Sequence, residues 1–300
     1  MASCNVTKSR TVFAMDTVIK IQASNDEIIE KIIENTNKID KALSFHNQDS
    51  ALSQLNFNRS IRNTDILTDC IKIAYNYSVK TDSAFNLALG QITSLYDFEN
   101  QVAPTKEYTE TLLATTNIEN IVFQSESINL KGAALVDLGG VAKGYALEKA
   151  VEILKQENQK EAYLNFGGSV YYLSNSLKPV GIKKPFSENE IAAELLVKNL
   201  AVTTAGNYER CFTKDNGFYH HIIDSKTGLP VNNGVNSVTV VSSSAIEGDI
   251  YSTALFVMGK EKGIEFANKN GISAVFILED GSIMLTNSLT YNKENKIILK

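Results

Sequence analysis

The most informative stretch of this chain is residues 136–146, which read VDLGGVAKGYA. It combines an acidic residue, a glycine pair, a lysine and a third glycine, and the following residues, LEKAVEILK, have the pattern of an amphipathic helix. A glycine turn that opens a helix suits anions, because small residues let a ligand approach the backbone and free N–H groups point toward negative charge. Lys143 adds a positive charge. The stretch predicts either a phosphate site or, in the plainer interpretation, a closely packed helix start after a buried strand.

The spacing of these glycines excludes the two commonest nucleotide-binding motifs. A Walker loop reads G-x-x-x-x-G-K-[ST], and no such run is present. A Rossmann fold carries G-x-G-x-x-G, whereas this chain has GG-x-x-x-G. Other parts of the chain must therefore decide between a ligand site and simple packing.

Composition describes an ordinary globular chain. Its 300 residues allow one large domain or two modest ones, and the hydrophobic and charged fractions, 43% and 21%, are typical of such proteins. The net charge of −5, without a basic cluster interleaved with aromatic residues, argues against nucleic acid as a partner. No run of about 18 apolar residues occurs, so no transmembrane helix is predicted.

The cysteines, Cys4, Cys70 and Cys211, lack metal-binding spacing. Their odd number suits a reducing compartment, or an exported protein that does not depend on disulfides. The opening Met-Ala-Ser-Cys resembles the end of a bacterial lipoprotein signal, whose cysteine becomes lipidated, but no apolar region precedes it. A lipid anchor and a chance cysteine in an N-terminal tail both remain open.

The hydrophobic pattern predicts a mixture of helices and strands. Many strands are joined by hairpins and no regular βαβ repeat appears, which favours an α+β fold with largely antiparallel sheets over a doubly wound one. Strands are expected at 12–21, 121–123, 128–130, 162–166, 194–197, 201–204, 237–242, 272–278 and 282–285. Helices are expected from Asn25 through Leu43, at 49–56 and 65–80, from Gly144 to about Asn158, and at 248–258 and 261–268.

Two further motifs carry polar side chains. Residues 203–210, TTAGNYER, place hydroxyl groups and a glycine before Tyr208 and Arg210, which fits a loop around an anion or a ring, or only a solvated turn. Residues 219–230, YHHIIDSKTGLP, contain adjacent histidines, and neighbours on a strand point to opposite faces. A site with both histidines on one metal is therefore disfavoured. His221 is the candidate for proton transfer, although a lone histidine is more often structural.

Residues 247–254, EGDIYSTA, form the last motif. If they start a helix, Asp249 and Thr253 lie one turn apart on the same face. A carboxylate and a hydroxyl are oxygen ligands of the kind that Mg²⁺ binds together with water and phosphate oxygens. The alternative is an acidic residue that complements the helix dipole, followed by a threonine bonded to the backbone.

Together these motifs resemble the ApbE family of FAD:protein FMN transferases over roughly residues 11–287. The family's segments appear in order and include a start similar to its Met-Gly-Thr. They lie at 14–17, 44–56, 136–146, 164–168, 204–210, 221–230 and 249–259.

The resemblance implies an α+β enzyme with its FAD site between two lobes. Such an enzyme uses Mg²⁺ to transfer FMN from FAD to a Thr or Ser hydroxyl of an acceptor protein through a phosphoester bond, and it releases AMP. The acceptor would carry a motif like Asp-x-x-Thr-Gly-Ala-Thr. Some relatives instead hydrolyse FAD to FMN and AMP, and a non-catalytic flavin-binding protein is a third alternative.

The resemblance also assigns residues by position. Asp249, Thr253 and the backbone carbonyl of Gly140 would hold Mg²⁺, and His221 and Asp249 would be catalytic. The remaining contacts to FAD would come from Met15, Phe45, His46, Tyr96, Asp97, Phe98, Asp137, Lys143 and Ile222. The chain departs from the family pattern at Asp16, Asn86, 96–98 and Ala205.

The expected organisation is a tail at 1–10 with the remnant of a lipoprotein anchor, a domain at 11–287 and a C-terminal tail at 288–300. A lipid on Cys4 would place the protein in the bacterial cell envelope, at the outer face of the cytoplasmic membrane or in the periplasm. A cytoplasmic location is the alternative.

Overall fold

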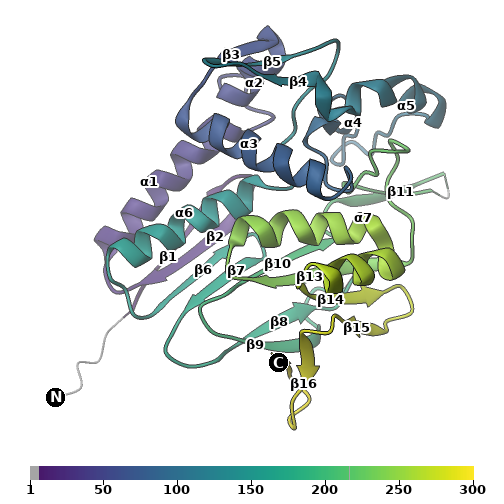
Figure 1. The fold of residues 1–300 in the computed structure, drawn as a ribbon. Helices are drawn as coiled ribbons and strands as arrows, with labels where there is room; N and C mark the ends of the chain where they lie inside the picture. Colours follow the sequence, from purple (N-terminus) through teal and green to yellow (C-terminus); the bar gives the residue numbers. More distant parts are fainter. Residues whose placement is uncertain (1–6, 216) are drawn as a thin grey trace.

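The centre of the molecule is an eight-stranded antiparallel sheet (Figure 1). The structure is a computed structural model and describes residues 7–215 and 217–300. The sheet has the order β1-β2-β6-β7-β10-β13-β14-β15. Its strands are β1 (Lys8–Ala14), β2 (Thr17–Ala23), β6 (Ala162–Phe166), β7 (Ser169–Leu173), β10 (Ala201–Gly206), β13 (Val235–Ser242), β14 (Ser273–Leu278) and β15 (Ile283–Leu285).

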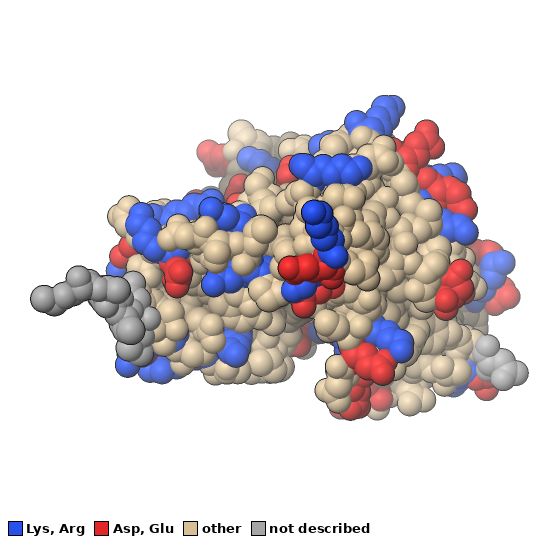
Figure 2. All heavy atoms as spheres, turned by 90° about the horizontal axis from the view of Figure 1, so that it is seen from below, with Lys and Arg blue, Asp and Glu red and all other residues tan. Residues whose placement is uncertain are grey.

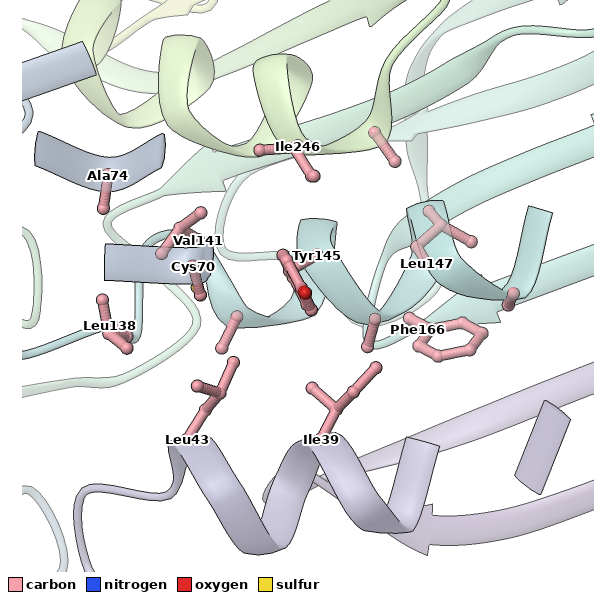
Figure 3. Packing of buried hydrophobic residues seen from close by; sticks show 14 of the residues in the cluster. Ile39, Leu43, Cys70, Ala74, Leu138, Val141, Tyr145, Leu147, Phe166 and Ile246 are labelled. Atoms are coloured by element: carbon pink, nitrogen blue, oxygen red, sulfur yellow. The ribbon is translucent and has the colours of Figure 1, made fainter. Parts of the chain in front are cut away.

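Three long helices cover one face of this sheet: α1 (Asp26–Leu43), α6 (Ala142–Gln156) and α7 (Ala245–Lys269). The side chain of Asn25 accepts a hydrogen bond from the N–H of Ile28 and so caps α1, as its place before the isoleucine repeat predicts. Figure 3 shows Ile39 and Leu43 of α1 directed toward Tyr145 on α6. This packing fixes the start of α6 against the rest of the core.

A second lobe lies beside the helices. It contains α2 (Ala51–Asn58), α3 (Asp65–Lys80), α4 (Gly90–Thr93) and α5 (Lys106–Leu112). A three-stranded sheet of β3 (Ser60–Arg62), β5 (Ser127–Leu130) and β4 (Ile121–Phe123) adjoins them. Short 3₁₀ helices occupy Leu87–Leu89, Leu113–Thr116 and Ile118–Asn120.

The opposite face of the main sheet is only partly covered. A four-stranded sheet packs on it through an apolar layer that includes Val180, Leu195 and Val202. This sheet has the order β16-β17-β9-β8, formed by β16 (Leu289–Tyr291), β17 (Ile297–Leu299), β9 (Ile191–Val197) and β8 (Lys178–Lys183). A separate ribbon joins β11 (Cys211–Lys214) and β12 (Gly217–His220).

The α+β class with largely antiparallel sheets is confirmed, and one local prediction needs correction. Residues 12–21 are parts of a hairpin rather than one strand, because Met15 and Asp16 adopt φ of 55° and 56° and reverse the chain. The family's usual glycine at position 16 fits this geometry, which side chains seldom adopt. The break predicted between the helices at 248–258 and 261–268 is confirmed, because α7 is kinked at a non-helical Gly259.

The expected tails are also shorter than predicted. Residues 289–291 and 297–299 form β16 and β17, so the segment 288–300 contributes two strands to a sheet, and their buried residues Leu289 and Ile297 pack under it. Strand β1 begins at Lys8, inside the expected tail at 1–10. Cys4 lies outside the described residues. Within the described residues, no helix has the length and apolar character needed to cross a bilayer.

Candidate functional site

A cavity of about 490 Å³ opens where the two lobes meet the sheet. This volume lies within the roughly 300–1,000 Å³ of small-molecule sites. Its walls come from the β1–β2 turn, the end of α1, the starts of α6 and α7, the end of β10 and the segment after β12. The residues predicted for the site that line it are Met15, Phe45, His46, Tyr96, Phe98, Asp137, Gly140, Lys143, His221, Ile222, Asp249 and Thr253.

The close approach of α6 and α7 positions the centre of this cavity. The N–H of Gly144 donates a 2.8 Å hydrogen bond to Oδ2 of Asp249, across 105 positions of sequence. A Cβ on Gly144 would lie 2.6 Å from both the carbonyl oxygen of Ala245 and the Cβ of Asp249. The third glycine of the 136–146 stretch is therefore required for contact between the helices.

Asp249 is the buried acid of the site, with 6% of its surface exposed. Burial raises the pKa of its carboxyl, and the charge of Lys143 and the N–H of Gly144 offset part of this rise. One helical turn later, Thr253 donates its hydroxyl to the Asp249 carbonyl over 3.3 Å, which leaves its oxygen lone pairs free. Both side chains face the cavity.

Gly140 completes this group from the α6 side. A Cβ built on Gly140 would lie 3.7 Å from Oγ1 of Thr253, so the glycine turn and the second turn of α7 are in contact. A carboxylate, a hydroxyl and a nearby backbone carbonyl are the hard oxygen donors that Mg²⁺ takes. Among the described residues, no three His, Cys, Asp or Glu side chains cluster as a metal site, so the donor set fits only an ion that keeps ligands from water or substrate.

Asp137 organises the glycine turn. Its Oδ1 accepts the N–H of Gly139 at 2.8 Å and its Oδ2 accepts the hydroxyl of Thr93 at 2.7 Å. The ammonium group of Lys143 lies 3.5 Å from the Gly139 carbonyl and influences the pKa values of both Asp249 and His221. The positive charge therefore stands at the cavity centre, within reach of a bound anion.

The two neighbouring histidines have opposite surroundings, although only His220 belongs to β12, which ends there. His220 is buried, and its Nε2 donates to the Val231 carbonyl at 2.8 Å. His221 faces the cavity, with Nδ1 3.4 Å from the Arg210 carbonyl. Desolvation by the cavity walls and the nearby charge of Lys143 lower the pKa of His221 below its ordinary value, but the side chain is exposed and solvent screens this shift. It is neutral at pH 7.

Aromatic side chains line two sides of the cavity. Phe45 and His46 meet edge to face at 5.6 Å, and Tyr96 and Phe98 stack with ring centroids 6.1 Å apart. The Tyr96 hydroxyl donates to the Gly228 carbonyl at 3.3 Å, which fixes that ring. Flat apolar walls beside a charged centre suit a ligand with both rings and phosphates.

The prediction that Asp97 belongs to the site needs correction. Asp97 is exposed and does not line the cavity. Its carboxylate accepts the Asn100 amide at 2.7 Å and the backbone N–H groups of Asn100 and Glu99, and these bonds lower its pKa. Asp97 thus holds its own turn, because a short acidic side chain at a turn bonds the following N–H groups.

Some cavity residues gave no sequence signal. Asp40 lies on α1 and accepts the N–H of Met15 at 2.9 Å, so it fixes the β1–β2 turn from a distant segment. Thr93 is the partner of Asp137 and follows no motif. Glu209 and Arg210 also line the cavity, at the end of the 203–210 motif. Asp40 and Thr93 could be found only from the fold.

Fold and site together define a mixed α+β protein with an oxygen-rich cavity for a ringed, anionic ligand. Residues 15–276 match the ApbE family, and the chain belongs to this family. The FAD:protein FMN transferase of Klebsiella pneumoniae is 28% identical over 291 residues, covering 93% of this chain and 90% of that protein. The corresponding protein of Escherichia coli K12 is 28% identical over 277 residues, covering 87% and 79%.

Solved structures agree with this assignment. The ApbE protein of Thermotoga maritima has a TM-score of 0.87 and 30% identity, covering 94% of this chain and 97% of that one. The flavin transferase ApbE of Vibrio cholerae has a TM-score of 0.80 at 24% identity and supports the fold alone. The ApbE-like fold expected from the sequence is confirmed.

Proposed function

We propose that this protein transfers the FMN half of FAD to a Thr or Ser hydroxyl of an acceptor protein and releases AMP. The names of its relatives in two bacteria support this reaction. The observation that carries the proposal is the meeting of Asp249, Thr253, Gly140 and His221 in one cavity. A phosphate-centred reaction needs charge neutralisation and a proton acceptor together at one point.

The bonds change at a single phosphorus atom. The acceptor oxygen attacks the phosphorus of the FMN half, and the bond from that phosphorus to the oxygen bridging to AMP breaks. AMP leaves with the bridging oxygen, and the hydroxyl proton passes to His221. When bound by Asp249, Thr253 and the Gly140 carbonyl, Mg²⁺ would offset the charge of the pyrophosphate as the bond breaks.

His221 is suited to accept this proton. With its own proton on Nδ1, it donates to the Arg210 carbonyl and keeps the lone pair of Nε2. A bound pyrophosphate brings negative charge that counters the effect of Lys143 and so acts to raise the pKa of His221. Lys143 and the N–H groups of the glycine turn orient the phosphates, and Met15, Tyr96 and Ile222 provide apolar contact to the rings.

The acceptor and the location form the finer part of the proposal. The acceptor carries an Asp-x-x-Thr-Gly-Ala-Thr-like motif, and the protein is anchored by a lipid on Cys4 at the outer face of the cytoplasmic membrane. The Ala-Ser-Cys sequence supports the anchor. Fatty-acid labelling of cells that express the wild type or Cys4→Ser tests it, since equal labelling of the two contradicts it.

An acceptor assay tests the transferase reaction. The protein is incubated with FAD and a peptide carrying the motif, with Mg²⁺ or with EDTA, and the peptide mass is measured. We expect an added FMN mass with Mg²⁺ only, and no addition when the acceptor threonine is alanine. FMN and AMP released without any acceptor would instead identify a pyrophosphatase, and tight FAD binding without turnover would identify a flavin-binding protein.

A further inference from the structure

A second hollow adjoins the cavity. Its volume is about 280 Å³, and it lies between β8 and the face of the main sheet that the long helices leave free. We call it the β8 groove. Residues 179–183 of β8 form one wall, and side chains of β6, β7, β10 and β13, including Asn165 and Thr239, form its floor.

Strand β8 presents an open edge to this groove. Within residues 7–215 and 217–300, β8 is the outer strand of its sheet and pairs on one side only, with β9. Residues of an antiparallel strand direct their N–H and C=O groups alternately toward and away from the partner. The N–H of Lys184 donates to the Glu190 carbonyl, so the backbone groups of Lys183 and Gly181 point away from β9. Pro179 lies two residues before Gly181 and shares its orientation away from β9, where its missing N–H costs no hydrogen bond to β9.

A residue at each end of the open edge limits the pairing of β8 with other strands. Pro179 cannot donate, and the charged side chain of Lys183 opposes unspecific pairing. Gly181 lies between them, exposed and without a side chain to shield its backbone. Only a short extended segment can pair at this point, which suits a brief and selective contact.

The groove leads directly into the cavity. Gly167, Thr204 and Glu209 line both spaces. A Thr or Ser hydroxyl extends only a short distance from its own backbone, so the chain that carries it must lie at the cavity mouth. A polypeptide in the β8 groove continues into the cavity without leaving the surface.

The groove carries charges of both signs, because Glu209 lines it and lies 3.9 Å from Lys183. Lys20 stands opposite Asn165 in the β2–β6 register and shares its face, while Lys183 stands on the other wall. Both lysines are exposed. Figure 2 views the molecule from below, on the side where β8 and β9 lie, and shows Lys and Arg as well as Asp and Glu side chains on this face.

We propose that the β8 groove holds an extended segment of the acceptor protein next to the residue that receives FMN. The segment pairs through its main chain with Gly181 of β8, as in strand addition to a sheet edge. This inference rests on the proposed transferase function, because it assigns the route by which the acceptor hydroxyl enters the cavity.

A matched pair of substitutions at one position tests the pairing. Gly181→Pro removes the outward N–H, whereas Gly181→Ala keeps it. Both place a Cβ 2.8 Å from Cγ2 of Ile191, an exposed side chain that can rotate. With the motif peptide, we expect KM to rise about fivefold for Gly181→Pro, the weight of one hydrogen bond, and less than about twofold for Gly181→Ala. The Kd for FAD, from flavin fluorescence, stays unchanged in both. Equal KM values for the two variants overturn the pairing.

Hydrogen exchange in the wild type gives a test that does not depend on how the variants fold. The protein is saturated with FAD in EDTA, and exchange is followed by mass spectrometry with and without the peptide. We expect the peptide to slow exchange in residues 178–184. Unchanged exchange there at saturating peptide overturns the inference. Slowed exchange in a protein that transfers no FMN when Mg²⁺ is restored contradicts the proposed function and supports the groove.

Discussion

The two helices that meet at the cavity, α6 and α7, contribute to it in opposite ways. Helix α6 starts at Ala142 after Val141, which provides no side-chain cap, and its start brings backbone groups together with the side chain of Lys143. The N–H of Gly144 binds Asp249, and the preceding Gly140 lies against Thr253. Function that is carried by the backbone requires the absence of side chains, so it leaves glycines in the sequence.

Helix α7 instead starts conventionally. The side chain of Ser244 accepts the N–H of Glu247, and the cavity groups are the side chains of the next two turns, Asp249 and Thr253. An acid and a threonine near a helix start also have ordinary structural roles. The comparison teaches that the α6 segment can be recognised as unusual by itself, whereas the α7 segment gains its meaning only from its partner.

The largest effect is expected on the α7 side. Asp249→Asn keeps an oxygen that can accept the N–H of Gly144 but loses the charge, so FMN transfer with Mg²⁺ falls by about 100-fold or more. Because burial raises the pKa of Asp249, its charged form destabilises the fold, and Tm of the metal-free protein stays equal or rises. Turnover by mass spectrometry and Tm by circular dichroism check both outcomes.

The matched control is Glu261→Gln, an exposed residue of the same helix with the same change of charge. It leaves both turnover and Tm near the wild-type values. A fall of Tm by several degrees in Asp249→Asn alone would mean that this carboxylate is structural, and the contrast between the helices would disappear.

The next effect is on the α6 side and appears in stability. Gly144→Ala would gain about 1 kcal/mol from helix propensity. Its Cβ, however, meets the Ala245 carbonyl and the Asp249 Cβ at 2.6 Å, and overpacking costs about 1–3 kcal/mol. We expect a net loss in the free energy of unfolding in urea, together with weaker transfer, because α6 and α7 must separate.

Gly139→Ala is the control for this substitution. Its Cβ would meet only a side-chain oxygen of Asp137, at 3.2 Å. Its unfolding free energy should change by less than about 1 kcal/mol. A Gly144→Ala protein more stable than the wild type would show that the close contact of the two helices is not needed.

The smallest effect concerns the pH dependence of stability, through His221 opposite Lys143. In the folded protein desolvation and then the charge of Lys143 lower the pKa of His221 below the roughly 6.5 of an unfolded chain. The unfolded state therefore binds an extra proton just below about pH 6.5, and stability falls as pH decreases through this range. His221→Gln removes this contribution, so the fall of Tm below pH 6.5 becomes shallower in protein without FAD or metal.

His46→Gln, an exposed histidine on another wall of the same cavity, serves as the control. The measurement is Tm by circular dichroism from pH 8 to pH 4 in the three proteins. A wild-type slope retained by His221→Gln would show that neither desolvation nor the charge of Lys143 lowers the pKa of His221.

Local patterns predicted much of the fold. The helix at 65–80 and the hairpin at 121–130 occur as expected, since each depends on spacing within one segment. The β1–β2 turn was missed because Met15 and Asp16 are not the Gly or Asn that normally mark a reversal with positive φ. The strands at 289–299 were missed because each is short and is stabilised by packing under a distant sheet.

By itself the sequence determined the glycine turn, the opposite surroundings of His220 and His221, and the spacing of Asp249 and Thr253, because each is set by the geometry of one segment. Only the tertiary structure decided that Gly144 touches Asp249, that Asp97 turns away from the cavity, and that β8 keeps an open edge beside it. Those features depend on contacts between segments far apart in the chain, and no local periodicity records which surfaces meet.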